Sequence, residues 1–222
     1  VQALMFADDT KLKSACQTQD QCQSLQTALN ILAERARNYG LLFNAEKSQL
    51  LICGSVHEEV ENLNLNGNKI AKSDLAKDLG VDFEPNLSWR RHVADRTNKA
   101  IRTMNAFRRN FSTRNMNALV RTWTMFIQSQ YTYGSVIWFS DDPINLKRLM
   151  KPWNKFWNLT GGRKPSQEVL NPIEFCVQAD LLFAWSIFNG KCKLNFDDYF
   201  TYVNHEQSTR QVTQSQIGRA HV

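Results

Sequence analysis

The chain begins with VQALMFADDTKLKSAC, residues 1–16, and this stretch decides the kind of fold that the following residues must support. Two short apolar runs, Val1 to Phe6 and Thr10 to Ala15, flank the acidic pair Asp8 and Asp9. Apolar runs of this length on either side of a polar bend are typical of a β-hairpin. The sequence therefore predicts a hairpin that presents two adjacent carboxylates at its bend.

A mixed helical and extended pattern continues from this hairpin to about residue 87. Thr18 and Gln21 form a capping box, which predicts the start of a helix, and Gly40 predicts its end. Asn66-Gly67 is a strong signal for a type I′ hairpin. Apolar runs predict further strands over 41–43, 49–53, 63–65, 69–71 and 79–83.

The pattern changes after Leu87, where the apolar residues take up helical spacing. The breaks in this spacing fall at Ser112, Pro143, Gly161-Gly162 and Gly190. They delimit predicted helices over 88–109, 113–138, 143–159 and 172–189. The predicted fold class is therefore α+β, with a mixed part up to residue 87 and an all-helical part after it.

Composition places the chain among globular proteins that can bury a core. It has 222 residues, of which 42% are hydrophobic, and no apolar run approaches the roughly 18 residues that a membrane span needs. The five cysteines are odd in number and include no C-x-x-C, so neither a disulfide framework nor a zinc ribbon is indicated. We expect an intracellular protein without a membrane partner, and the sequence does not distinguish nucleus from cytoplasm.

The positive charge is concentrated in the middle of the chain. Residues 1–89 have a net charge of −4, residues 90–164 have +12, and residues 165–222 have −2. A segment this basic is typical of a surface that binds a polyanion such as nucleic acid. The alternative is a set of solvated faces on amphipathic helices, although such faces usually mix both signs of charge.

Phe6-Ala7-Asp8-Asp9 is the tetrapeptide that indicates chemistry. Nucleotidyl transfer uses two divalent cations about 3.5 to 4 Å apart, and Mg²⁺ prefers carboxylate oxygens held at neighbouring positions. The alternative is an Asx-type turn that only closes the hairpin. The tetrapeptide alone does not decide between a metal site and a structural turn. The order of the motifs that follow it favours the metal site.

Four further motifs follow in a fixed order. They are GLLFNAEKS at 40–48, KDLGVDF at 77–83, LSWRRHV at 87–93 and QYTYGSVIW at 130–138. Together with FADD, this order resembles the reverse transcriptases of non-LTR retrotransposons, the LINE-type elements of jockey and CR1 kind. The resemblance covers about residues 1–165, and the block at 147–159 departs from the family's usual Q-(K/R)-R helix.

The resemblance implies a domain organisation. Residues 1–87 would be the C-terminal part of a polymerase palm, and 88–165 a basic helical region like a thumb or connection. Residues 166–216 would form a helical segment without an assigned role. The last six residues, 217–222, match the translation of a short-read sequencing adapter, so we expect them to be an artefact.

The resemblance also implies roles for individual residues. Asp8 and Asp9 would be metal ligands, with Asp8 the more direct one. Asn44 and Lys47 would contact the incoming nucleotide, and Lys47 would be the general acid for pyrophosphate departure, unless it is only an exposed residue at a strand end. Leu79, Gly80 and Val81 would belong to a primer-grip hairpin. The residues expected along the phosphates of the nucleic acid are Arg90, Arg91, Arg96, Lys99, Arg102, Arg108 and Arg109.

The function that the resemblance implies is RNA-directed DNA polymerisation by two-metal catalysis. The cofactor would be two Mg²⁺ or Mn²⁺ ions, and the partners an RNA template with a DNA primer and deoxynucleoside triphosphates. Because this family needs a third carboxylate and a fingers region ahead of Val1, we expect a truncated chain that does not polymerise alone. The alternative is a non-catalytic nucleic-acid-binding remnant, while an unrelated α/β enzyme lacks any supporting glycine loop.

Several other features are interpreted structurally. Asp141-Asp142 and Asp197-Asp198 are expected at helix starts, where the helix dipole favours acidic residues. His92 is expected on the surface of the thumb-like region and not as a catalytic base. Several aromatic residues of the central helices are expected in the core, and the cysteines are expected to be core residues or incidental.

Overall fold

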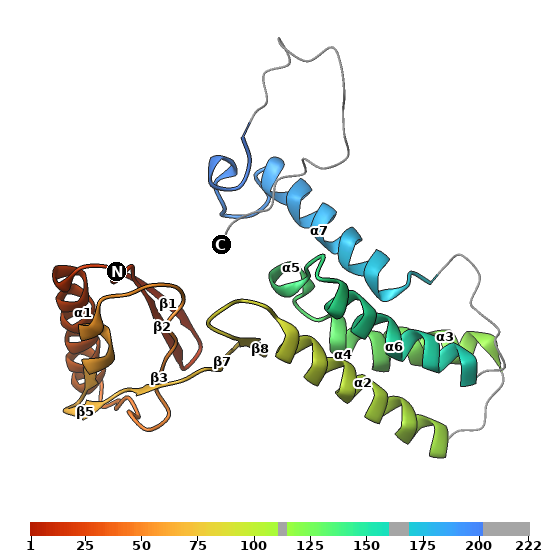
Figure 1. Cartoon of the computed structure of the whole chain (residues 1–222), viewed down its shortest axis with the longest axis horizontal. Helices are drawn as coiled ribbons and strands as arrows, with labels where there is room; N and C mark the ends of the chain where they lie inside the picture. Colours follow the sequence, from red (N-terminus) through yellow and green to blue (C-terminus); the bar gives the residue numbers. More distant parts are fainter. Residues whose placement is uncertain (111–114, 160–168, 202–222) are drawn as a thin grey trace, which may run out of the picture. The chain divides into compact units, whose positions relative to one another are not determined.

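A computed structural model gives the fold, and it describes residues 1–110, 115–159 and 169–201. The chain divides into two compact units. Unit 1 consists of Val1–Lys99 and Asp142–Arg148, and unit 2 of Ala100–Asp141 and Leu149–Val222. The predicted change at residue 87 lies just before α2, the helix within which the chain passes from unit 1 to unit 2 (Figure 1).

Unit 1 opens with the predicted hairpin. Strand β1 (Gln2–Phe6) pairs antiparallel with β2 (Asp9–Lys13), and the helix α1 (Gln19–Asn38) follows. The capping box is present, because the Thr18 side chain accepts from the Gln21 backbone and the Gln21 side chain accepts from the Thr18 N–H. The prediction of a hairpin followed by a capped helix is confirmed.

The rest of unit 1 consists of short strands and one 3₁₀ helix. β3 (Gln49–Leu50) pairs in parallel with β6 (Ala71–Lys72), while β4 (Asn64–Leu65) pairs antiparallel with β5 (Asn68–Lys69). Two more strands, β7 (Ala76–Asp78) and β8 (Val81–Phe83), form another antiparallel pair. The 3₁₀ helix η1 covers Glu58–Asn62.

The strand predictions in this part are only partly right. Asn66 and Gly67 have φ of 52° and 80°, as the predicted type I′ turn requires. Residues 41–43 form no strand, and the predicted strand 49–53 is reduced to the two residues of β3. The predicted strand 79–83 begins at Val81, because 79 and 80 form a turn.

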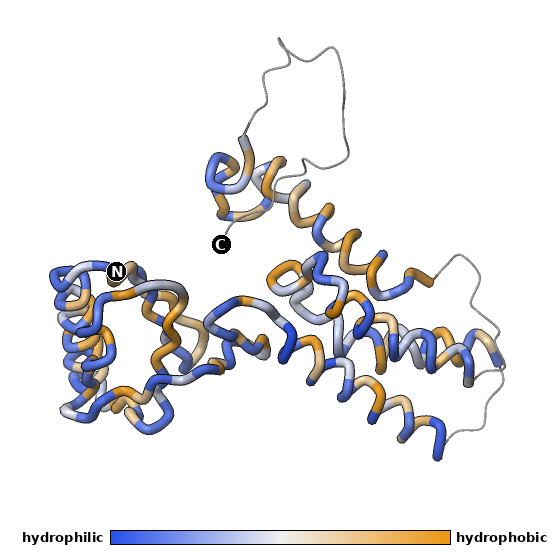
Figure 2. The backbone as a smooth tube through the Cα atoms, in the orientation of Figure 1, coloured by the Kyte–Doolittle hydropathy of each residue, from blue (hydrophilic) through white to orange (hydrophobic). Residues whose placement is uncertain are grey.

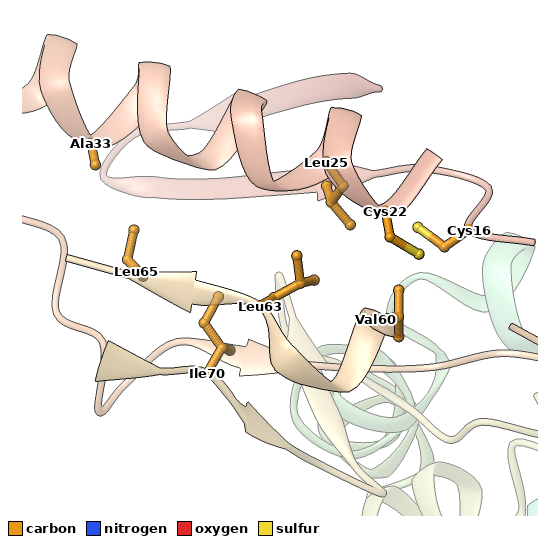
Figure 3. Close-up of a cluster of buried hydrophobic side chains, with 8 residues drawn as sticks. All are labelled: Cys16, Cys22, Leu25, Ala33, Val60, Leu63, Leu65 and Ile70. Atoms are coloured by element: carbon orange, nitrogen blue, oxygen red, sulfur yellow. The ribbon is translucent and has the colours of Figure 1, made fainter. Parts of the chain in front are cut away.

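The core of unit 1 lies between α1 and the segment that contains η1 and β4 (Figure 3). Leu25 and Ala33 of α1 point toward Leu63 and Leu65, as Figure 3 shows. The full buried cluster consists of Cys16, Cys22, Leu25, Ala33, Val60, Leu63, Leu65 and Ile70. Burial of these side chains is the main stabilisation of the unit, since each large one contributes about 1.5–3 kcal/mol.

The all-helical prediction for the second half is confirmed for the described residues. The long helix α2 (Arg90–Asn110) is followed by α3 (Met116–Thr122) and η2 (Trp123–Gln128), a π-helix. Next come α4 (Ser129–Thr132), α5 (Ser135–Trp138), α6 (Pro143–Leu159), α7 (Pro172–Phe188) and the short 3₁₀ helix η3 (Phe196–Asp198). Hydrophilic and hydrophobic stretches alternate along α2 and α6, as amphipathic helices require (Figure 2).

The helix predicted over 113–138 is interrupted. Gly134 has a φ of 66°, which only glycine adopts readily, and it separates α4 from α5. The π-helical turn of η2 also departs from the 3.6-residue repeat on which the prediction was based. In this turn the indole Nε1–H of Trp123 donates to Oε1 of Gln128 at 2.6 Å, and both side chains are buried.

Aromatic side chains form the core of unit 2. Trp123 is fully buried and contacts the rings of Tyr131, Trp153, Phe156 and Trp157, with ring centroids between 5.2 and 6.2 Å apart. Edge-to-face and tilted arrangements of this kind add about 0.5–1.5 kcal/mol per pair beyond burial. The prediction that the central aromatic residues are core residues is confirmed for these side chains.

Three sequence-based expectations fall outside the described residues. They are the helix breaks at Ser112 and at Gly161-Gly162, and the six-residue end 217–222. In the part of the chain that the structure describes, none of the helices has the length and apolar character needed to cross a bilayer.

Candidate metal centre and nucleic-acid interface

The acidic hairpin closes with a two-residue turn. Phe6 pairs with Asp9 across the strands, so the turn consists of Ala7 and Asp8. Ala7 has a φ of 51°, in the left-handed region that tight hairpin turns use. Asp8 thus lies at the tip and Asp9 at the start of β2, and both are exposed. The predicted placement of two adjacent carboxylates at the bend is found, except that Asp9 belongs to the strand.

This pair does not by itself make a complete two-metal site. Within residues 1–110, 115–159 and 169–201, no group of three or more His, Cys, Asp or Glu side chains is arranged to hold a metal ion. Asp8 and Asp9 supply two exposed carboxylates, the ligand type that hard divalent cations prefer. No catalytic step follows from these two residues alone.

Strand β1 is exposed along its whole length. All five of its residues are exposed, including Leu4 at 46%, Met5 at 72% and Phe6 at 64% of their full accessible surface. In unit 1, β1 pairs with β2 and with no other described strand. A bare, apolar strand edge of this kind is uncommon, because it attracts further strands.

Asn44 has a local structural role. Its side-chain oxygen accepts hydrogen bonds from the backbone N–H groups of Glu46, at 2.9 Å, and Lys47, at 3.2 Å. Ser48 donates to the Asn44 carbonyl from both its backbone N–H and its hydroxyl. Asn44 therefore fixes the turn that carries Lys47, which is an Asx-type arrangement.

Lys47 itself is exposed. Among the described residues, no hydrogen bond or ion pair joins Lys47 to Asp8 or Asp9. The structure therefore does not bring the expected general acid and the expected metal ligands into contact.

The predicted primer-grip residues form the tip of the β7–β8 hairpin. Leu79 and Gly80 occupy its turn with φ of 45° and 87°, and Val81 begins β8 and is buried. The guanidinium group of Arg96 donates to the Gly80 carbonyl. Leu79 is nearly half exposed in a backbone conformation that costs a leucine of order 1–3 kcal/mol.

Lys11 of β2 connects the β1–β2 hairpin to the β7–β8 hairpin, and sequence reasoning missed it. Its ammonium group forms an ion pair with Asp78 of β7 and lies 5.0 Å from the centre of the Phe83 ring. Lys11 and Asp78 are 67 residues apart, and no local pattern in the sequence signals such a pair.

His92 is buried, so its expected surface position is wrong. Only 1% of its surface is accessible, and its Nδ1 accepts a hydrogen bond from the Asp82 backbone N–H at 3.1 Å. Its neighbour Val93 is also buried, because α2 turns the face that includes both residues toward the protein. Burial lowers the pKa of the imidazole below its usual value, against the raising effect of the Asp82 carboxylate.

The predicted phosphate-contacting residues all lie on α2, but they are not equivalent. Arg96 is half-buried and bonded to Gly80, so it is already engaged within the protein. Arg90 donates to Asp142 at 2.9 Å, and this bond lowers the pKa of the Asp142 carboxyl. The other members of the set are exposed: Arg91, Lys99, Arg102, Arg108 and Arg109.

Three of the exposed arginines share one stripe of α2. Arg91, Arg102 and Arg109 are separated by eleven and then seven residues, close to three and two helical turns. The opposite face, with Val93 and Ala100, is buried. This stripe, with the exposed Lys99 and Arg108 beside it, presents positive charge to solvent.

Further polar residues that the sequence reasoning did not single out lie in unit 2. Lys151, Asn154, Lys155 and Asn158 of α6 line an open groove together with Ile101 of α2. Their spacing of three and four residues places them on one helix face, which is the signal that could have found them.

Comparisons of the chain with protein-family models, with curated proteins and with solved structures find no match.

Proposed function

We propose that this chain is part of an RNA-directed DNA polymerase of the non-LTR retrotransposon type. Asp8 and Asp9 are then two of the ligands of its catalytic Mg²⁺ or Mn²⁺ ions. The observation that carries the proposal is the tight hairpin turn, which presents both carboxylates to solvent at consecutive positions. The order of the motifs from residue 6 to residue 138 supports it.

The bare edge of β1 is a second support. In the proposed enzyme, the acidic hairpin is one part of a larger palm sheet, and a neighbouring strand brings a further carboxylate. The exposed apolar residues of β1, such as Met5 and Phe6, are suited to packing within such a sheet. An isolated hairpin that only closes a turn has no need of them.

The basic helix α2 supplies the nucleic-acid partner in this proposal. Arg91, Arg102 and Arg109 lie on one stripe, and contacts from such residues to phosphates are independent of base sequence. This independence suits an enzyme that copies any template. The roles of Asn44 and Lys47 toward the nucleotide remain part of the proposal and require that a substrate approach the turn that Asn44 fixes.

The competing function is that of a nucleic-acid-binding remnant with a vestigial acidic turn. The observation that favours it is the lack of a third acidic or metal-binding side chain near Asp8 and Asp9 in the described part of the chain. Both functions predict binding to a template and primer. They differ in whether a divalent cation binds at the hairpin.

Binding of an RNA–DNA hybrid tests the proposed partner. We expect affinity to fall steeply with salt, and we expect Arg102→Ser with Arg109→Ser to reduce the slope of log K against log salt by about 2. A matched control, Lys13→Ser with Lys69→Ser, removes the same charge from exposed positions of unit 1. An equal effect of both double variants would contradict a specific role for α2.

Primer extension tests the catalytic part. With Mg²⁺, an RNA template and a DNA primer, the chain alone is expected to incorporate no nucleotide, because two carboxylates do not complete a two-metal site. Incorporation that Asp8→Ala abolishes would overturn this expectation, although it would support the family assignment.

A further inference from the structure

The groove in unit 2 is the feature of the molecule that the proposed function leaves unexplained. Ile101 of α2 forms one part of its lining, and the other part is a face of α6. Its volume is about 520 Å³, and it is open to solvent. The lining residues of α6 are Lys151, Asn154, Lys155 and Asn158.

The charge around this groove is of one sign. Helix α6 contains four basic residues and no acidic one between Pro143 and Leu159. Lys151 and Lys155 are exposed, and neither takes part in an ion pair within the described residues. The positive charge of the groove is therefore available to an anionic ligand.

The alternation of residue types indicates which anion fits. Lys151 and Lys155 are four residues apart, which corresponds to a rise of about 6 Å along the helix. Two lysines four residues apart share one helix face, so both ammonium groups can contact phosphates of the same strand. Asn154 lies between the two lysines in sequence, and Asn158 follows the second. Their amide groups offer donors to phosphate oxygens and both donors and acceptors to sugar hydroxyls.

The groove is shallow and open to solvent, so a strand bound in it would run along the face of α6 and remain accessible from its other side. The side chain of Ile101 and the aliphatic stems of the lysines give the apolar lining that a sugar ring needs.

We propose that this groove binds the sugar–phosphate backbone of a single nucleic-acid strand. Lys151 and Lys155 contact phosphates of the same strand, and Asn154 and Asn158 hydrogen-bond to sugar and phosphate oxygens. The inference rests on the proposed function for the class of ligand, nucleic acid. It adds residues of α6 to the arginine stripe of α2, and none of them belongs to the acidic hairpin.

Fluorescence anisotropy with the full chain and a single-stranded oligonucleotide of about ten nucleotides tests the proposal. We expect Lys151→Ser with Lys155→Ser to weaken binding and to lower the salt slope by about 1.4, because each phosphate contact on a single strand contributes about 0.7. Lys151→Arg with Lys155→Arg should keep both affinity and slope. Asn154→Ala with Asn158→Ala should weaken binding and leave the slope unchanged.

Three results would overturn the proposal. The first is an unchanged slope in the double serine variant, and the second is an equal loss in the control Lys13→Ser with Lys69→Ser. The third is full displacement of the strand by tripolyphosphate at the same phosphate concentration, which would indicate a site for any free anion. If the groove variants are silent while Arg102→Ser with Arg109→Ser weakens hybrid binding, this inference fails and the proposed function stands.

Discussion

Asp180 of α7 is a carboxyl group in an unfavourable environment. Its Oδ1 atom is buried and has no hydrogen-bond partner among the described residues. Burial raises the pKa of this group from 3.8 to about 6. Between these two pH values, the folded state still holds a proton that the unfolded state has lost. This contribution to stability is therefore present below about pH 4 and is lost as the pH rises through 6.

We predict that Asp180→Asn stabilises unit 2 at pH 8 and has little effect at pH 4. We expect the free energy of unfolding at pH 8 to rise by about 1 kcal/mol, which is less than the full pKa shift would give because the carboxyl is partly exposed. This gain corresponds to roughly 2–4 °C in Tm for a chain of this size. Thermal unfolding at both pH values measures the difference. The control Asp197→Asn, at an exposed position, should shift neither Tm, and an Asp180→Asn variant that is less stable at pH 8 would refute the prediction.

His92 in unit 1 should give the opposite pH dependence. Its pKa is lowered by burial, so the unfolded state binds the proton more readily than the folded state. This contribution to stability is complete above the unfolded pKa of about 6.5 and is lost as the pH falls below it. We predict that unfolding by urea becomes easier from pH 7 to pH 5, and that His92→Gln reduces this change. Both chains, with His92 and with His92→Gln, carry Asp180→Asn so that the titration of Asp180 does not contribute. The same change in urea unfolding between pH 7 and pH 5 in both chains would contradict the prediction.

Asn44 offers a matched pair of variants. The Asn44 oxygen accepts two backbone hydrogen bonds, so Asn44→Ala should lower the free energy of unfolding by about 1 kcal/mol. Asn44→Asp keeps an acceptor oxygen in the same place and should cost much less. Urea denaturation compares the two variants. An equal loss in both would mean that the amide NH₂ group, and not the oxygen, stabilises the turn.

At the level of the elements, a single side chain organises the core of unit 2. Trp123 lies at the centre of the aromatic cluster and is also bonded to the buried Gln128. We predict that Trp123→Ala costs about 3–5 kcal/mol and leaves unit 2 unfolded or loosely packed. Trp123→Phe should cost less but still leave the Gln128 oxygen without its indole donor. Near-UV circular dichroism and urea unfolding measure both, and a variant with alanine that retains native stability would contradict this role.

Elements with strong local signals were predictable from the sequence. The capping box at Thr18 marks the start of α1, and Asn66-Gly67 marks the β4–β5 turn. These signals are local, because the side chains that hydrogen-bond to the helix backbone, or the residues that form the turn, lie within a few positions of one another. The same is true of the acidic turn at Asp8.

Elements that depend on distant contacts were not predictable. The turn at Leu79 uses a left-handed conformation that leucine rarely adopts, whereas the apolar pattern predicts a continuous strand over 79–83. His92 is buried because α2 packs that face inward, whereas its neighbouring arginines suggested a surface position. The contact of Lys11 with Asp78 joins segments far apart in the chain, and no periodicity indicates it.

At the scale of the whole molecule, the two units have different roles in the proposal. Unit 1 contains the acidic hairpin and the turn that carries Lys47, and unit 2 contains the groove of α6. Helix α2 carries basic residues in both units. Within the described part of residues 90–164 the basic side chains lie on helices, whereas the acidic pair Asp8 and Asp9 lies in a hairpin.

The central claim is that Asp8 and Asp9 bind catalytic metal ions, and Mn²⁺ binding followed by NMR tests it most directly. The chain contains a matched control in Asp197 and Asp198, which are also adjacent and exposed. Dilute Mn²⁺ broadens the amide signals of residues near its binding site, and nucleotide phosphates should strengthen binding at a polymerase centre.

We predict selective broadening at residues 6–10 that increases with added deoxynucleoside triphosphate. Asp8→Asn with Asp9→Asn should abolish it, and Asp197→Asn with Asp198→Asn should leave it unchanged. Equal broadening at both aspartate pairs, or none at the hairpin, would contradict the account and favour the vestigial turn of a nucleic-acid-binding remnant.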